Sequence, residues 1–349
     1  MKKILLCASL FSMISTLAVA DYTKGLAALQ RGDYTEAEQE LKETLDMGDA
    51  KSQYLMAFMY YHGLGVNLDY NRAFSLFEKS AAQGNIDSQT YLAYMYDTGK
   101  GVKVDKKKAF DLYQASSDEG DSTATMNLAV LYYRGDGVPQ NYEKAFDLMT
   151  SIERVQNSIV QFYMGNFYFY GLGTEKNTEK AVPHYIAAAR LGSVEAHYVL
   201  GHLYQNGMSV EQDSEKALSY YEYAAMKGFP LAQFNLATMY ADGKSGNVDK
   251  VKAYVWLSQA IKNEVEPAKK ALSKLSDSMS MSEISKAKTE IIELDKKLAD
   301  PNVVSPAGSI EAQPSLFDVQ QGLNGFNNPQ SSPESQQFGR RSVRMVRRR

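Results

Sequence analysis

Hydrophobic and polar positions recur along most of the chain with a period of 36 residues. A tyrosine, a glycine and an alanine return in each period at fixed distances from one another, without an insertion over six periods. The tyrosines are Tyr60, Tyr96, Tyr132, Tyr168, Tyr204 and Tyr240, the glycines are Gly63, Gly99, Gly135, Gly171, Gly207 and Gly243, and the alanines are Ala73, Ala109, Ala145, Ala181, Ala217 and Ala253. A fixed period of this length is typical of a protein built from stacked copies of one supersecondary unit.

Each period predicts two helices joined by a glycine turn. Leu128, Ala129 and Tyr132 fall on one helical face, and Gly135 follows where a helix end needs a left-handed residue. The second helix begins at a column of Asp or Asn, which satisfies its free N–H groups, and carries the alanine column followed by a large residue. These large residues are Phe77, Tyr113, Met149, Tyr185, Tyr221 and Leu257. We expect them to form the core together with the tyrosine column.

One joint between periods departs from the pattern. Other periods close with a glycine, such as Gly120 or Gly192, whereas Gln156-Asn157 stands at this place. We expect Asn157 to supply the left-handed turn here, because asparagine tolerates that conformation better than most residues. The joint is also the place where the stack is expected to be looser.

The order of these residues resembles Sel1-like repeats, which are relatives of the tetratricopeptide repeat. Residues 53–66, QYLMAFMYYHGLGV, match the repeat closely, and the resemblance covers residues 49–263. The resemblance implies an all-α fold, a right-handed α-solenoid of stacked helical hairpins. It also implies an adaptor or assembly scaffold that binds proteins, and bacterial proteins of this kind are often exported.

The ends of the chain predict four further segments. Lys2-Lys3, an apolar run and Ala18-Val19-Ala20 together predict a cleaved signal peptide over 1–20. Residues 21–48 resemble a degenerate N-terminal repeat, and 264–300 predict two capping helices, with Pro267 in a first helical turn and Ser280 in a capping box. Residues 301–349 are rich in Pro, Gln, Asn and Ser and predict a disordered tail.

Composition narrows the possible chemistry. The chain has 349 residues, a net charge of −3, one cysteine and four histidines. Because six arginines lie within 340–349, the rest of the chain is acidic, which argues against nucleic-acid binding. The Gly-x-Gly elements recur after helices and therefore indicate turns rather than phosphate loops. No HExxH or Gly-x-Ser-x-Gly spacing is present, so we expect no enzyme activity, no cofactor and no metal.

A binding surface remains as the expected functional feature. In the related tetratricopeptide hairpin the first helix lines a concave groove, and the corresponding positions here vary from period to period. The candidate groove residues are Tyr54, Phe58, Tyr61, Tyr94, Tyr133, Phe162, Phe169, Tyr170, Tyr198, His202 and Phe234. Large aromatic side chains are frequent where proteins bind proteins, so we predict a protein or peptide partner. The alternative that several of these rings pack between neighbouring hairpins stays open.

The basic end of the tail has three interpretations. It is a solvated terminus, a contact to an anionic envelope surface or an acidic partner, or a nucleic-acid-binding segment, which export argues against. The arginines concerned are Arg340, Arg341, Arg344, Arg347, Arg348 and Arg349. For the whole protein we expect a non-enzymatic scaffold in the cell envelope, either periplasmic or secreted. The alternatives are a secreted effector that binds host molecules and, less favoured, a hydrolase; neither the partner nor the oligomeric state follows from the sequence.

Overall fold

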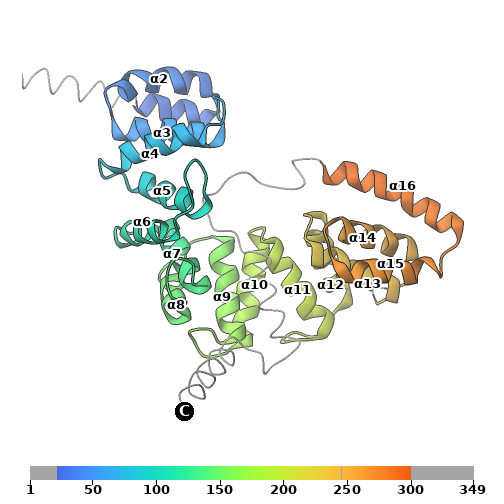
Figure 1. The fold of residues 1–349 in the computed structure, drawn as a ribbon. Helices are drawn as coiled ribbons and strands as arrows, with labels where there is room; N and C mark the ends of the chain where they lie inside the picture. The colour runs from blue at the N-terminus through green and yellow to red at the C-terminus, as the bar shows by residue number, and fades with distance from the viewer. Residues whose placement is uncertain (1–21, 245, 300–349) are drawn as a thin grey trace, which may run out of the picture. The chain divides into compact units, whose positions relative to one another are not determined.

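The structure is a computed structural model, which describes residues 22–244 and 246–299. The regular elements in these ranges are all helices (Figure 1). Residues 22–31 are helical, and the later helices are α2 (Tyr34–Asp46), α3 (Ala50–His62), α4 (Tyr70–Ala81), α5 (Ile86–Thr98), α6 (Lys106–Asp118), α7 (Ser122–Arg134), α8 (Tyr142–Ser151), α9 (Ser158–Tyr170), α10 (Thr178–Arg190), α11 (Val194–Asn206), α12 (Ser214–Met226), α13 (Pro230–Asp242), α14 (Lys250–Lys262), α15 (Glu266–Ser276) and α16 (Met281–Leu298). The predicted signal peptide and tail lie outside the described residues.

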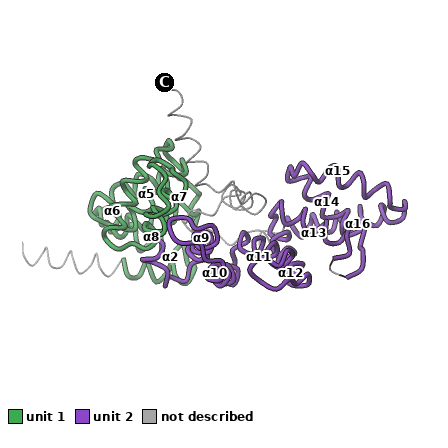
Figure 2. Tube along the Cα trace, turned by 90° about the horizontal axis from the view of Figure 1, so that it is seen from below, with its two compact units in different colours: residues 1–148, 308–311 green, residues 149–307, 312–349 purple. Residues whose placement is uncertain are grey.

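The chain divides into two compact units, and the division falls at Leu148–Met149, within α8 (Figure 2). Consecutive helices pack against each other from α2 to α7 in unit 1 and from α9 to α15 in unit 2, where α16 also packs on α14. The predicted all-α stack of helical hairpins is therefore confirmed for the described residues. None of the helices within these ranges is both long and apolar enough to cross a bilayer.

The unit boundary lies in α8, the helix that directly precedes the irregular joint at Gln156-Asn157. The helix α8 has 10 residues, whereas its counterparts α6 and α10 have 13. The prediction that Asn157 supplies a left-handed turn is wrong, because its φ is −131°. Its side chain instead accepts hydrogen bonds from the backbone N–H groups of Ile159 and Val160 and so caps α9. Asparagine serves here as a helix N-cap, the other role for which its short side chain is suited.

Two local features form the turn within each hairpin, a left-handed glycine and a backbone hydrogen bond between the two helices. The first is the glycine column, in which each residue ends its helix in the left-handed region, for example Gly63 at φ +67°. The second is a backbone hydrogen bond that ties the second helix to the first, as when the Asp69 N–H donates to the Tyr60 carbonyl at 3.0 Å. A second glycine, two residues after the first, lets the turn pack closely on the preceding hairpin. A Cβ on Gly101 would lie 2.4 Å from the Tyr70 carbonyl oxygen, which is too close for any other residue to fit without a shift of the backbone.

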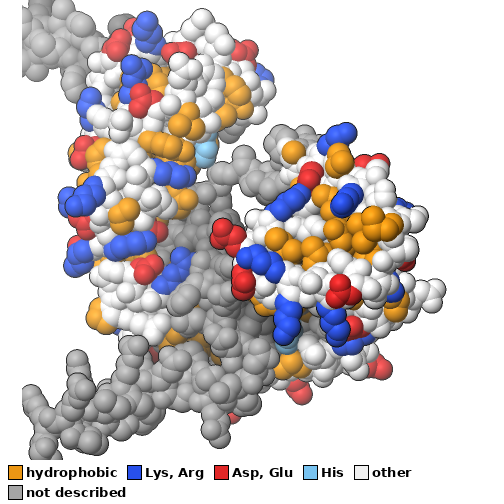
Figure 3. Space-filling model, turned by 45° about the vertical axis from the view of Figure 1, so that its right-hand side comes forward, with side chains coloured by type: hydrophobic (Ala, Val, Ile, Leu, Met, Phe, Trp, Pro, Cys, Tyr) orange, Lys and Arg blue, Asp and Glu red, His pale blue; other side chains and the backbone are white. Residues whose placement is uncertain are grey.

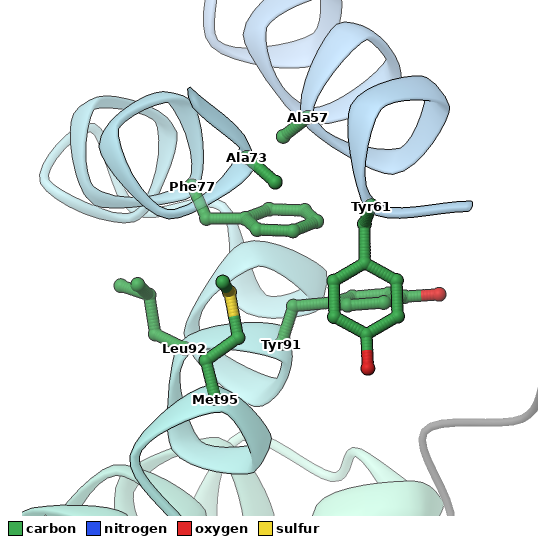
Figure 4. Close-up of a cluster of buried hydrophobic side chains, with 7 residues drawn as sticks. All are labelled: Ala57, Tyr61, Ala73, Phe77, Tyr91, Leu92 and Met95. Carbon is green, nitrogen blue, oxygen red and sulfur yellow. The ribbon is translucent and has the colours of Figure 1, made fainter. Parts of the chain in front are cut away.

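The core lies between the helices of neighbouring hairpins. The predicted large residues of the second helices are fully or almost fully buried, with exposed fractions of 2% or less. Figure 4 shows one such cluster in unit 1, in which Phe77 lies beside Ala73 and faces Tyr91. The rings of Phe77 and Tyr91 stack with their centroids 4.6 Å apart. In unit 2, Gly165 replaces the small alanine beside Tyr185, and a Cβ there would lie 2.6 Å from that ring.

The last two helices cover the end of unit 2. Pro267 lies in the first turn of α15, and α16 begins with a capping box in which Ser280 and Glu283 bond to each other's backbone N–H groups. Ala287 is fully buried, and Asp295 accepts hydrogen bonds from Gln259 and Lys262 of α14. These contacts fix one face of α16 against the last hairpin.

Candidate functional site

Two predicted groove residues and a histidine form a continuous aromatic row on α3. Tyr54, Phe58 and His62 are spaced by four residues, which puts them on one side of the helix. The ring centroids of Tyr54 and Phe58 are 6.5 Å apart, and those of Phe58 and His62 are 4.3 Å apart. All three side chains are half-buried. Together with the half-buried Tyr94 of α5 they form what we call the α3–α5 aromatic surface.

The buried Tyr61 and Tyr91 pack against this surface on its core side. Tyr91 lies with its ring centroid 6.0 Å from those of Tyr54 and Phe58. Tyr61 lies 5.6 Å from Tyr91 and 6.5 Å from Tyr94. Aromatic pairs at these separations pack favourably in tilted and edge-to-face arrangements. The half-buried rings of the surface are therefore held in place by their neighbours, which lowers the entropy cost of using them in binding.

A lysine stands among the tyrosines at one end of the surface. Lys100 donates a hydrogen bond from Nζ to the Tyr61 Oη at 2.8 Å. Its Nζ also lies 5.0, 5.5 and 5.3 Å from the ring centroids of Tyr61, Tyr70 and Tyr94. Burial lowers the pKa of Lys100, while the electron-rich ring faces attract its charge. The sequence analysis missed Lys100, Tyr70 and Tyr91, although Lys100 is recognisable as a lysine between the two turn glycines.

The electrostatics of the surface are set by burial and by two nearby carboxylates. Burial raises the pKa of Tyr54, and the Asp87 charge raises it further. Burial and then the Asp121 carboxylate raise the pKa of Asp87. Burial and then the Lys100 ammonium lower the pKa of His62, so its imidazole is neutral at pH 7. The surface is therefore uncharged at its centre, with carboxylates close to Tyr54.

The predicted groove residues fall into two groups by exposure. Five are buried and offer a partner little area, which favours packing for them; these are Tyr61, Tyr133, Phe162, Phe169 and Tyr198. Six are half-buried, and their role in binding stays a prediction; these are Tyr54, Phe58, Tyr94, Tyr170, His202 and Phe234. The tail arginines lie outside the described residues.

In unit 2 the predicted residues pack closely among themselves and their neighbours. The ring centroid of Phe169 lies 5.0 Å from that of Tyr170, and that of Tyr198 lies 4.9 Å from that of Phe229. Burial raises the pKa of Tyr198 to about 12. Burial also lowers the pKa of His202. These features are those of packed side chains, so the aromatic surface of unit 1 is the stronger candidate site.

The tyrosine column that we expected in the core lies at its edge. Only Tyr132 and Tyr240 are buried, at 8% and 7% exposed, and the other four members are half-buried. Each ring is covered by a basic side chain from the second helix of the same hairpin. The pairs are Arg72 on Tyr60, Lys108 on Tyr96, Lys144 on Tyr132, Lys180 on Tyr168, Lys216 on Tyr204 and Lys252 on Tyr240. The sequence analysis missed this basic column, although it also recurs every 36 residues.

The described residues offer no evident metal site, since no group of three or more His, Cys, Asp or Glu side chains within them could hold an ion. On the face drawn in Figure 3, basic and acidic side chains are interspersed and hydrophobic patches lie between them. Mixed charge around apolar patches is typical of a protein-binding surface rather than a nucleic-acid-binding one.

Comparison with known protein families finds the same repeat that the 36-residue period predicts. The Sel1 repeat family matches six segments, residues 50–85, 86–121, 122–151, 158–193, 194–229 and 230–264. The short third match ends with α8, and the next begins with α9. None of the curated proteins compared with the chain matches it.

Two solved structures share the fold. A Sel1 repeat protein from Oxalobacter formigenes has a TM-score of 0.63 and 26% identity, over 69% of this chain and 96% of that one. A protective antigen present in uropathogenic Escherichia coli strains has a TM-score of 0.61 and 23% identity, over 81% of this chain. The present chain covers 61% of the E. coli protein. Sel1 repeat proteins are generally protein-interaction scaffolds and are typically non-catalytic. With six matched repeats, this chain belongs to the Sel1 repeat family.

Proposed function

We propose that the protein is a non-enzymatic adaptor of the bacterial cell envelope that binds a protein or peptide partner on the α3–α5 aromatic surface. The observation that carries the proposal is the half-buried row of Tyr54, Phe58 and His62, supported from below by Tyr91. Pre-positioned aromatic side chains supply much contact area at a low entropy cost, as at interface hot spots.

The position of the carboxylates indicates which partner the surface favours. The Asp87 charge acts on Tyr54 and Tyr91, so the acidic side of the surface lies at this end of the row. At the other end Lys100 is enclosed by tyrosines and offers little free charge. A segment with apolar side chains and a basic residue directed at Asp87 complements both features.

Site-specific cross-linking tests the surface. A photo-reactive phenylalanine analogue is placed at Phe58 or, as a matched control, at Phe110, which is also half-buried but packs on Tyr132 outside the α3–α5 aromatic surface. In cells of the source organism we expect a discrete cross-linked partner from position 58 and not from position 110. Phe58→Ser should weaken binding of that partner by about tenfold or more, while Phe110→Ser should not. Equal cross-linking from both positions would contradict the proposal.

The envelope location rests on the N-terminal sequence. A basic start, an apolar run and Ala18-Val19-Ala20 predict export and cleavage after Ala20. Mass spectrometry of the native protein should find a chain beginning at Asp21, in the periplasm or the medium. A native protein that begins at Met1 and stays in the cytoplasm would refute this part of the proposal.

The tail is proposed to add an electrostatic contact to an anionic surface. Six arginines within ten residues attract phosphate and carboxylate groups, and salt screens such attraction over about 10 Å at 0.1 M. Binding of a chain that lacks 301–349 to anionic vesicles should be lost, while its helical content stays unchanged. If the shortened chain binds the vesicles as well as the full chain, the tail has no such role.

A further inference from the structure

A cavity of about 390 Å³ opens in unit 2 where α16 covers the last hairpin. Trp256 and Leu294 contribute apolar walls, and three carboxylates line it, those of Glu222, Glu290 and Glu293. Cavities of this size accommodate small ligands or single side chains of a partner. An apolar wall beside carboxylates fits a ligand that combines a hydrocarbon stem with a positive charge.

Trp256 supplies the largest ring in the cavity wall. The residue is 8% exposed, and its indole N–H makes no hydrogen bond within residues 22–244 and 246–299 but is not among the buried polar atoms that lack a partner. The N–H is therefore open to water, which an acceptor from a ligand can replace. The main-chain carbonyl of a docked peptide would supply that acceptor, which a metal ion would not.

The charges around the cavity leave a carboxylate available. The Tyr240 hydroxyl donates a hydrogen bond to the Glu222 carboxylate at 2.6 Å, and the Lys252 Nζ lies 4.9 Å from the Tyr240 ring centroid. Glu222 and Lys252 are therefore already engaged with Tyr240. Glu290 forms a long ion pair of 3.9 Å with Lys286. Glu293 makes no ion pair within the part of the chain that the structure describes. Glu290 and Glu293 are three residues apart and so are neighbours on α16.

We propose that this cavity binds an arginine side chain from the chain's own segment 340–349. The guanidinium stacks on the Trp256 indole, the strongest of the cation–π partners, and pairs with Glu290 and Glu293 by charge-assisted hydrogen bonds. Its hydrocarbon stem covers Leu294. A main-chain carbonyl of the segment accepts the indole N–H.

The course of the chain favours this occupant over a separate basic peptide. The helix α16 ends at Leu298, directly after Lys297, which also lines the cavity. The segment that follows reaches Arg340 after 41 residues, a length that spans up to about 140 Å when extended. A tethered segment acts at an effective concentration of about 1 mM, so a site with a dissociation constant of about 1 mM is roughly half-filled. The lining carries three glutamates against two lysines, Lys252 and Lys297, so it keeps an excess of negative charge that an arginine complements.

The single tryptophan of the chain makes the test direct. Acrylamide quenching of Trp256 fluorescence is compared between the mature chain and a variant with glutamine at the six tail arginines. The substitutions are Arg340→Gln, Arg341→Gln, Arg344→Gln, Arg347→Gln, Arg348→Gln and Arg349→Gln. We expect the glutamine tail to increase the quenching constant by about twofold, as for loss of a site that is roughly half-filled at millimolar effective concentration. A synthetic peptide of residues 338–349 should reverse the increase.

Three further measurements decide between occupants. The pair Glu290→Gln and Glu293→Gln should increase quenching with the native tail present, and circular dichroism verifies that α16 still forms. Six Arg→Lys changes should protect Trp256 less than arginine does, because lysine lacks the planar fork. Protection should not change on dilution; a loss on dilution would assign the segment to a second copy and overturn the proposal. Equal quenching with the arginine and glutamine tails would also overturn it, whatever the cavity variant does.

Discussion

Two columns of large side chains repeat every 36 residues in this protein, and they lie in different environments. The second-helix column, which includes Tyr185 and Tyr221, is fully buried between hairpins. The first-helix tyrosine column, which includes Tyr168 and Tyr204, lies at the edge under a lysine. Both columns consist of large side chains and both keep the 36-residue register, so the period alone identifies positions that pack but does not rank their burial. The difference in burial predicts a difference in stability contribution, which mutations can measure.

The largest effect is expected for truncation of a core ring. Tyr221→Ala removes a fully buried side chain whose hydroxyl donates to Gln205 at 2.9 Å, and should cost about 3–5 kcal/mol. Tyr204→Ala, in the same hairpin, removes a half-buried ring and should cost about 1 kcal/mol. Urea unfolding followed by circular dichroism measures both. Equal costs would mean that the edge column is packed as tightly as the core.

The second effect tests how closely the core column fits its neighbours. A Cβ on Gly201 would lie 2.7 Å from the Tyr221 ring, so Gly201→Ala should cost about 1–3 kcal/mol through overpacking. The sign of the change in unfolding free energy is informative, because alanine in a helix is otherwise about 1 kcal/mol more stabilising than glycine. In a Tyr221→Leu background the same change should cost less, since the clashing ring is gone. If Gly201→Ala stabilises both backgrounds, the ring has room to move.

These contacts show which parts of the fold the sequence could predict. The left-handed glycines and the Asp or Asn helix caps depend on a few neighbouring residues, and they lie where expected, as at Gly63 and Asp69. Burial depends on which helix of the next hairpin approaches, and this is why Tyr61 is buried while Tyr54, seven residues earlier, is only half-buried. A single period carries no information about that approach.

The candidate site was predicted only in part for the same reason. Tyr54, Phe58 and Tyr94 were found from their spacing on the first helices. Lys100 and Tyr70 come from a turn and from the start of a second helix, and they meet only in the folded hairpins. The basic column over the edge tyrosines could have been found, because it shares the 36-residue period that identified the tyrosines themselves.

A third prediction concerns the hydroxyl groups within the core column. Tyr185 donates from Oη to Asn166 Oδ1 at 2.9 Å, so Tyr185→Phe leaves a buried acceptor unpaired and should cost about 1–2 kcal/mol. The Tyr113 Oη is buried without a hydrogen-bond partner among the described residues. Tyr113→Phe should therefore be neutral or slightly stabilising. Urea midpoints of the two single variants separate the outcomes, and a costly Tyr113→Phe would reveal a bound water at its hydroxyl.

The smallest effect is expected at the edge column, from removal of a covering charge. Lys108 holds its Nζ 5.0 Å from the ring centroid of Tyr96, and Lys108→Gln should cost about 0.5 kcal/mol, as for an exposed cation–π contact. Lys103→Gln is the matched control, because Lys103 is exposed and has no ionic or ring contact among residues 22–244 and 246–299. Lys108→Arg should retain the stability, since a guanidinium also stacks on tyrosine. If Lys108→Gln and Lys103→Gln shift the urea midpoint equally, the basic column contributes only net charge. A larger loss at Lys108 alone would show that the edge tyrosines depend on their lysines, whereas the core column depends on shape.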